Sequence, residues 1–211
     1  NTLMILHIHQ PISGNKIASL SCSGGEASLV ADLAEPLHFI FPKLSPKQKR
    51  ELKSALGDLV HLSNPLDYQT YVWNDQVKLT MAFKSMMEEP YDFLFIIMDL
   101  PKQSRCSSDA WYPAIAALKE AKKNAKCPVG LITSLEENMP EKFAKDLIRH
   151  SIIPLTGLEN SLAAVKALQN VGIQWKVEST PSIIWERWPN EKSRVLDEYQ
   201  SKKVLSTIGI N

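Results

Sequence analysis

The chain has 211 residues, of which 44% are hydrophobic and 22% are charged, and its formal net charge is +1 at pH 7. This size and composition suit one globular domain with an appendage. The near-zero net charge provides no basic field for nucleic acid. The longest apolar run, Phe93 to Met98, is far too short to cross a bilayer. We therefore expect neither nucleic acid nor a membrane among the partners of this chain.

The three cysteines, Cys22, Cys106 and Cys127, are an odd number without metal-ligand spacing, and the five histidines are scattered singly. This pattern predicts a reduced, cytoplasmic protein with free thiols and no metal site. Residues 1–11 read as the end of a linker helix that begins before the chain does. We therefore expect the sequence to be a piece of a longer protein.

Apolar runs rich in β-branched residues alternate with amphipathic helical patterns from residue 16 to residue 170. The expected strands are 16–22, 37–41, 59–62, 93–98, 128–133 and 152–155. The expected helices are 25–34, 46–56, 75–88, 110–124, 140–150 and 158–170. Such alternation predicts an α/β fold, a doubly wound parallel sheet of about five strands. The flavodoxin-like strand order is favoured, and the dinucleotide-binding order is the alternative.

The alternation stops after residue 172, which gives a predicted domain at 12–172 and a connector at 173–190. The connector contains Trp175, Trp185 and Trp188, and these side chains are expected to pack against the domain surface. A C-terminal helical pattern follows within residues 191–211, with an apolar side that has little to pack against in this chain.

Two glycines stand where the first predicted strand gives way to a helix. Backbone N–H groups at such a junction, together with the positive end of the helix dipole, can bind a phosphate group. We therefore predict an anion site formed by Ser23, Gly24, Gly25, Glu26 and Ala27. The alternative is a tight turn that only lets helix and strand approach closely. The Glu26 carboxylate opposes the anion site, because it can itself occupy the positive end of the helix.

A second wall of the same site is expected from the segment after residue 62. Pro65 forces Asn64 into an extended conformation, and Asn64 and Asp67 can bond nearby backbone groups and hold the loop in shape. Loops that follow adjacent parallel strands meet at one edge of the sheet, so these residues are predicted to shape the site. Aromatic surface for this wall would come from Tyr68, Tyr71 and Trp73.

Asp99 follows the strand at 93–98 and is a further candidate for shaping the site, with an Asx turn as the alternative. Lys102 and Arg105 lie in the same loop and could neutralise a bound phosphate. A nucleophile elbow at Cys22 or Ser23 lacks a histidine in a suitable loop, which argues against a hydrolase. A flavodoxin-like module that binds FMN or a phosphorylated metabolite remains the alternative function.

Several segments resemble the NDP-forming acyl-CoA synthetases, relatives of succinyl-CoA synthetase. The resemblance rests on residues 14–25 with Ala31-Asp32, on Asn64 to Asp67, and on residues 196–210. It covers about residues 12–170 as one domain and 191–211 as the first helix of a truncated ATP-grasp module. Residues 21–28 and 64–68 also look like the feruloyl-CoA-synthetase-like subgroup.

The resemblance implies an acid–thiol ligase that joins a carboxylic acid to CoA and cleaves ATP to ADP and phosphate. Residues 12–172 would correspond to the C-terminal part of the succinyl-CoA synthetase β subunit, where a helix N-terminus faces a phosphohistidine. The partners would be a CoA-binding Rossmann domain, a phosphohistidine domain and an ATP-grasp domain, and homodimer formation is left open. ATP, Mg and CoA would serve the whole enzyme, whereas this piece would bind no cofactor and be inactive alone.

Overall fold

The computed structural model describes residues 1–102, 104–177, 195–207, 209 and 210. The chain divides into a compact unit, Asn1–Val177, and a second unit, Glu178–Asn211. The elements in chain order are α1 (Thr2–Ile8), β1 (Ile17–Ser21), α2 (Gly24–Ala34), α3 (Pro46–Leu56), β2 (Leu66–Asp67), α4 (Gln76–Met87), β3 (Phe93–Ile97), η1 (Asp109–Trp111), α5 (Tyr112–Lys122), β4 (Val129–Thr133), η2 (Glu136–Asn138), α6 (Glu141–Arg149), β5 (Ile153–Thr156), α7 (Leu158–Gln174) and α8 (Glu198–Thr207).

The first unit contains one five-stranded parallel sheet with the order β2-β1-β3-β4-β5. In the register, Leu20 of β1 lies opposite Leu66 of β2, and Ile17 of β1 lies opposite Phe93 of β3. The order reverses between β1 and β3, as in flavodoxin-like folds. The favoured strand order, and the α/β class of about five parallel strands, are therefore confirmed.

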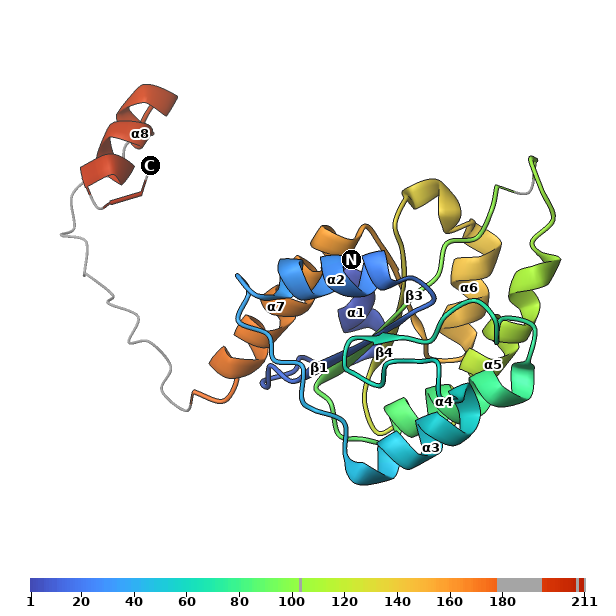
Figure 1. Ribbon diagram of the computed structural model, residues 1–211. Coiled ribbons are helices and arrows are strands. Elements are labelled where there is room, and N and C mark those ends of the chain that lie inside the picture. The colour runs from blue at the N-terminus through green and yellow to red at the C-terminus, as the bar shows by residue number, and fades with distance from the viewer. Residues whose placement is uncertain (103, 178–194, 208, 211) are drawn as a thin grey trace. The chain divides into compact units, whose positions relative to one another are not determined.

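Helices cover both faces of the sheet (Figure 1). On one face α1, α2 and α7 bury a core with Phe93, Phe95 and Ile97, and on the other α3, α4, α5 and α6 bury a core with Leu94 and Ile96. Alternate side chains of a strand point to opposite faces, so a strand covered on both sides is apolar throughout. This explains why the run at 93–98 is apolar without interruption. Because all five strands are parallel, their carboxyl ends lie at one edge of the sheet.

Two of the predicted strands are wrong. Residues 37–41 contribute only an isolated bridge between Lys16 and Ile40. Residues 59–62 form no strand, and Leu59 is 87% exposed. The strand next to β1 is instead β2, which has two residues and lies after Pro65. A short apolar run carries no periodicity that separates a strand from a loop, which is why the sequence misplaced it.

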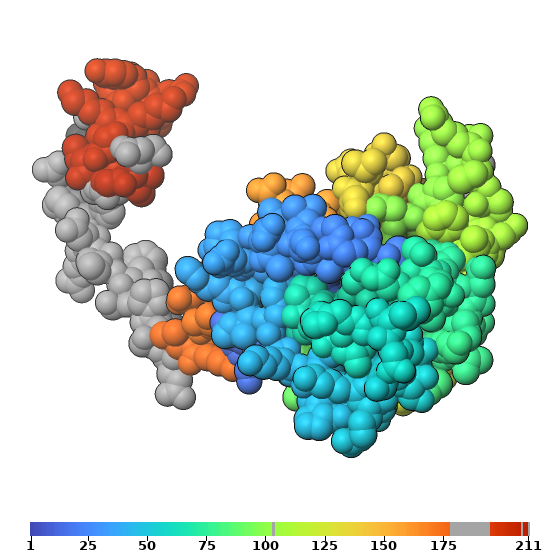
Figure 2. Space-filling model, viewed as in Figure 1, coloured from blue at the N-terminus to red at the C-terminus, as the bar shows by residue number. Residues whose placement is uncertain are grey.

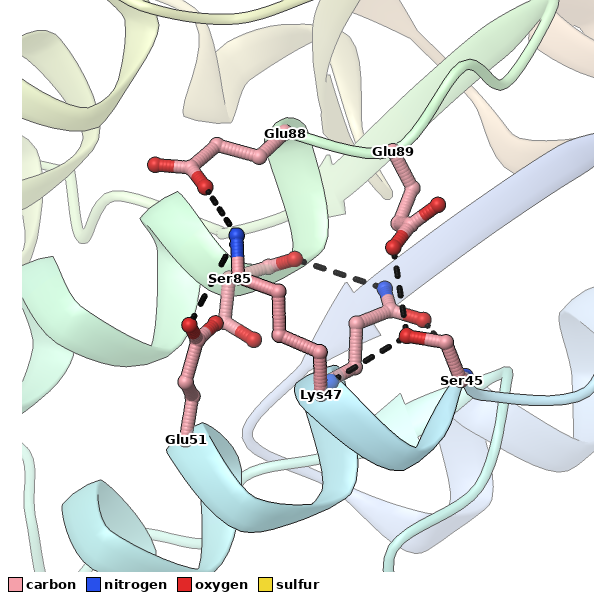
Figure 3. A network of polar contacts seen from close by, with 7 residues as sticks. Ser45, Lys47, Glu51, Ser85, Glu88 and Glu89 are labelled. Carbon is pink, nitrogen blue, oxygen red and sulfur yellow. Dashed lines mark hydrogen bonds and ion pairs between the residues drawn. The ribbon is translucent and has the colours of Figure 1, made fainter.

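Helix α3 is fixed by a polar network at its start (Figure 3). The Ser45 hydroxyl accepts from the Gln48 backbone and the Gln48 side chain accepts from the Ser45 backbone, which is a capping box. The Gln48 amide also donates to the Tyr91 hydroxyl at 3.0 Å, and Lys47 contacts Glu88 at 2.9 Å. These contacts hold α3 against the end of α4.

Helix α7 continues to Gln174, beyond the predicted end at residue 170, and Trp175 is its C-cap. The Trp175 side chain is 74% exposed, so the expectation that it packs on the domain surface is wrong. Trp185 and Trp188 lie outside the described residues. In the second unit α8 spans Glu198–Thr207, within the predicted C-terminal helix. No helix in the described part of the chain has the length and apolar character to cross a membrane.

Candidate functional site

Helix α2 begins with an uncovered first turn at the carboxyl end of β1. Ser23 is its N-cap residue, with extended backbone and no side-chain capping bond, and Gly24 and Gly25 are exposed. No acceptor among the described residues takes a hydrogen bond from the N–H groups of Gly24, Gly25 or Glu26, whereas the Ala27 N–H donates to the Ser23 carbonyl at 3.1 Å. Three free donors at the positive end of a helix are available to an anion.

One side of this turn opens into a shallow depression of about 590 Å³ between α2 and the start of α7. Its polar lining comes from Ser23, Gly25, Glu26, Ser134 and Glu159, and its apolar lining comes from leucines of α2 and α7. Ser134 follows β4 and was not among the predicted site residues. The signal for it was available, since the loop after β4 lies at the same edge of the sheet as the glycine turn.

The other side of the turn faces the segment that follows β2. A Cβ atom at Gly24 would lie 3.2 Å from the Asp67 Oδ2 atom, so this approach favours glycine. Figure 2 shows the surface of α2 beside that of the segment between β2 and α4. The glycine turn after β1 and the end of β2 therefore lie together at one edge of the sheet.

Asn64 shapes the loop by pairing with the backbone of β1. Its side-chain oxygen accepts from the Ser19 N–H at 3.2 Å, and its amide donates to the Ile17 carbonyl at 3.0 Å and to the Pro42 carbonyl at 3.3 Å. The side chain thus replaces the backbone partners that β2, being only two residues long, does not supply to this part of β1.

Replacing Asn64 by alanine is expected to lower the free energy of unfolding by about 2 kcal/mol, because it leaves backbone groups of β1 without partners. Asn74→Ala is the control: Asn74 is exposed, and its loss should change stability by less than about 0.5 kcal/mol. Urea denaturation of both variants measures the difference. Equal stability of the two variants would mean that water replaces the Asn64 contacts.

Three carboxylates surround the start of α2. Asp67 accepts from the Gln69 backbone at 3.0 Å and from the Gln69 amide at 2.6 Å. Asp99 accepts from the Ser134 N–H at 2.7 Å and from the Asn138 amide at 2.9 Å. Asp67 and Asp99 therefore hold the shapes of the loops after β2 and β4.

Glu26, the third carboxylate, has no compensating partner. Its buried Oε2 atom has no hydrogen-bond partner in the described structure. Burial, then the charges of Asp99 and Asp67, raise the pKa of Glu26 from its ordinary value of 4.5 to about 7. A pKa of about 7 means that near pH 7 the Glu26 side chain is protonated in about half of the molecules.

The raised pKa of Glu26 predicts that stability falls with rising pH. Between pH 4.5 and pH 7 the folded state binds more protons at this residue than the unfolded state, so the free energy of unfolding decreases as pH rises through that window. Glu26→Gln lacks this titration and should gain stability over the original chain from pH 5 to pH 8. Urea denaturation at pH 5 and at pH 8 measures the difference in free energy of unfolding between the variant and the original chain. The same difference at both pH values would contradict the raised pKa.

Several predicted contributors do not reach the site. Tyr68 is fully buried in the core, and Tyr71 lines neither side of the turn. Lys102 and Arg105 are exposed, and neither lines the two depressions beside α2. Burial, followed by the charge of Glu26, raises the pKa of Cys22 to about 11, so this thiol is a poor nucleophile.

Comparisons with solved structures reproduce this fold in part of much longer chains. PH0766 from Pyrococcus horikoshii OT3 aligns with a TM-score of 0.60 and 24% identity, over 81% of this chain and 40% of that one. The dinucleotide forming acetyl-coenzyme A synthetase 1 of Ca. Korarchaeum cryptofilum aligns in its apo form with a TM-score of 0.58 and 16% identity, over 83% and 38%. Its complex with phosphate and ADP aligns with a TM-score of 0.56, also at 16% identity, over 84% and 38%.

These likenesses establish a common fold, and this chain spans about two fifths of the length of those structures. No protein-family model matches the sequence, and the search of curated proteins returned no match. The class that the fold defines is a flavodoxin-like α/β fold, which is similar to part of the acetyl-coenzyme A synthetase 1 structures.

Proposed function

We propose that this chain is part of an NDP-forming acyl-CoA synthetase, which joins a carboxylic acid to CoA with cleavage of ATP to ADP and phosphate. The fold likeness to an acetyl-coenzyme A synthetase supports this proposal, as do the motifs at residues 14–25 and 64–67. The remaining domains, which would bind CoA and ATP and carry the histidine, would belong to the same enzyme. The feruloyl-CoA-synthetase-like subgroup is the proposed subgroup, and the cytoplasm is the proposed location.

Within that enzyme, we propose that the start of α2 binds the phosphoryl group of a phosphohistidine from another domain. The observation that carries this role is the uncovered first turn, with free N–H groups at Gly24, Gly25 and Glu26. Backbone amides and the helix dipole attract a phosphate without a local lysine or arginine. A second helix N-terminus from the partner domain would complete the site, since fixed dipoles stabilise the charge without reorganising.

The Glu26 side chain lowers the affinity of this site for phosphate but does not abolish binding. Its carboxylate lies near Asp67 and Asp99, and its pKa of about 7 leaves the neutral form well populated at neutral pH. A neutral Glu26 removes the repulsion that a carboxylate would exert on a phosphate. Phosphate binding at α2 is therefore expected to be stronger in Glu26→Gln than in the original chain.

The alternative is an FMN-binding module, which would use the same free N–H groups at the start of α2 for the FMN phosphate. Binding of FMN to the purified protein separates this function from the proposed one. Absence of colour in the purified protein, and no thermal stabilisation by FMN, are the expected results.

Phosphorylation of the complete protein tests the proposal. The enzyme is incubated with Mg and ATP labelled in the γ-phosphate, and the labelled protein is then exposed to acid and to base. We expect an acid-labile, base-stable phosphohistidine that CoA and a carboxylic acid discharge together. Protein that takes up no label, or label that CoA and a range of acids leave in place, would contradict the proposed ligase.

A further inference from the structure

A pocket of about 420 Å³ lies on the side of α2 opposite α7, at the point where the strand order reverses. Its walls come from the ends of β1 and β3, from the segment between β2 and α4, and from η1. Its lining includes Cys22, Glu26, Thr70, Trp73, Asp99 and Trp111. Its volume is within the range of small-molecule sites, and strand-order reversals are where such sites form in open α/β sheets.

The pocket offers hydrogen-bond acceptors and negative charge. Glu26 and Asp99 line it, Asp67 lies close by, and its lining in the described structure contains no lysine, arginine or histidine. The Oε2 atom of Glu26 is buried without a partner. A ligand that donates hydrogen bonds or carries positive charge would pair with the Glu26 carboxylate, which lines the pocket, whereas an anion would be repelled.

Aromatic rings form the outer wall. The Trp73 and Trp111 rings meet edge to face, with centroids 5.9 Å apart and planes at 88°. Tyr68 stacks behind Trp73 at 6.4 Å. The faces of tryptophan rings attract cations, and their area binds the hydrocarbon part of a ligand.

A metal ion is a poor fit to this pocket. Among the described residues no group of three or more histidine, cysteine, aspartate or glutamate side chains is arranged to hold one. The Oδ1 atom of Asp99 accepts the hydrogen bonds from Ser134 and Asn138 that shape the loop, so this oxygen is already in use. An organic cation can contact the tryptophan rings as well as one carboxylate, so it fits this lining better than a metal ion does.

We propose that this pocket binds an organic cation, an amine with an aromatic or other apolar body, whose ammonium group pairs with Glu26 and whose body lies against Trp73 and Trp111. The site is separate from the proposed phosphate site, although both border Glu26. A bound cation neutralises the Glu26 carboxylate and so raises the affinity of α2 for phosphate, and by linkage phosphate raises the affinity for the cation.

Three probes of similar shape test the pocket in the full 211-residue chain: benzylamine, benzyl alcohol and benzoate, titrated by calorimetry at pH 8. We expect benzylamine to bind at least about tenfold more tightly than benzyl alcohol, and benzoate not to bind. Backbone amide NMR signals of residues 70–74 and 109–112 should move with benzylamine. Equal binding of the three probes, or signal changes confined to other surfaces, would overturn the proposal.

Variants locate the charge that the amine contacts. Glu26→Gln should weaken benzylamine binding about tenfold, whereas Asp32→Asn, an exposed acid on the same helix, should leave it unchanged. Benzylamine affinity should also rise from pH 6 to pH 8 as Glu26 ionises among the facing groups Cys22, Asp67, Tyr68 and Asp99.

Glu26→Gln is expected to strengthen phosphate binding and to weaken amine binding, so failure of one proposal is distinguishable from failure of the other. Unchanged amine affinity in folded Glu26→Gln would refute the role of this carboxylate.

Discussion

Gly25→Glu is expected to reduce phosphohistidine turnover in the complete enzyme about a hundredfold, because it places a carboxylate among the amides that are proposed to bind the phosphoryl group. The side chain has room, since Gly25 is exposed and a Cβ atom there would lie 3.5 Å from the Ser23 Oγ atom. A carboxylate in the first turn of a helix also stabilises that helix. Activity should therefore fall while stability stays the same or rises.

Gly25→Gln is the matched control for this experiment, because glutamine has the same shape without the charge. We expect it to retain turnover within a few-fold of the original, since size alone is tolerated at an exposed first turn. The rate at which CoA and acid discharge labelled phosphohistidine measures both variants. Equal losses in the two variants would show that bulk at position 25, and not charge, is what the site rejects.

Gly172→Ala is expected to lower the free energy of unfolding by about 3 kcal/mol, the largest stability effect of any substitution considered for this fold. A Cβ atom at this buried position of α7 would lie 2.0 Å from the carbonyl oxygen of Ile12. Because the clashing atom belongs to the backbone of Ile12, it cannot rotate away as a side chain can. Either the segment after α1 or helix α7 therefore has to move. Since alanine normally stabilises a helix interior over glycine by about 1 kcal/mol, the contact reverses the usual sign.

Gly25→Ala provides the comparison for Gly172→Ala, because its Cβ atom meets only an ordinary contact. Urea denaturation should show a loss for Gly172→Ala and no loss for Gly25→Ala. A Gly172→Ala variant as stable as the original chain would mean that the segment containing Ile12 shifts at little cost. In that case the packing of α1 and its following segment on α7 would contribute less than the structure indicates.

The sequence predicted the fold where an element is marked by an unbroken apolar run between clear boundaries or by a helix-capping motif. The run from Phe93 to Met98 identified the central strand, and Ser45 with Pro46 marked the start of α3, which the capping box confirms. It failed at β2 because pairing with β1 depends on two residues and on the Asn64 side chain, and neither leaves an apolar pattern.

The candidate site was predicted in its parts but not in its arrangement. Glu26 was visible in the first turn of a predicted helix, and Asp67 and Asp99 were visible in segments that follow predicted strands. Parallel strands bring such ends together. That the three acids converge without a basic partner depends on loop paths that follow from tertiary packing. Trp111 was missed for the same reason, since the segment that positions it has no regular spacing.

A titration of this chain with inorganic phosphate, followed through backbone amide NMR signals at pH 7, tests the proposed phosphate site most directly. We expect saturable shifts centred on Gly24, Gly25 and Glu26, with tighter binding in Glu26→Gln and none in Gly25→Glu. Signals of these three amides that stay in place while other surfaces respond would contradict a phosphate site at the start of α2.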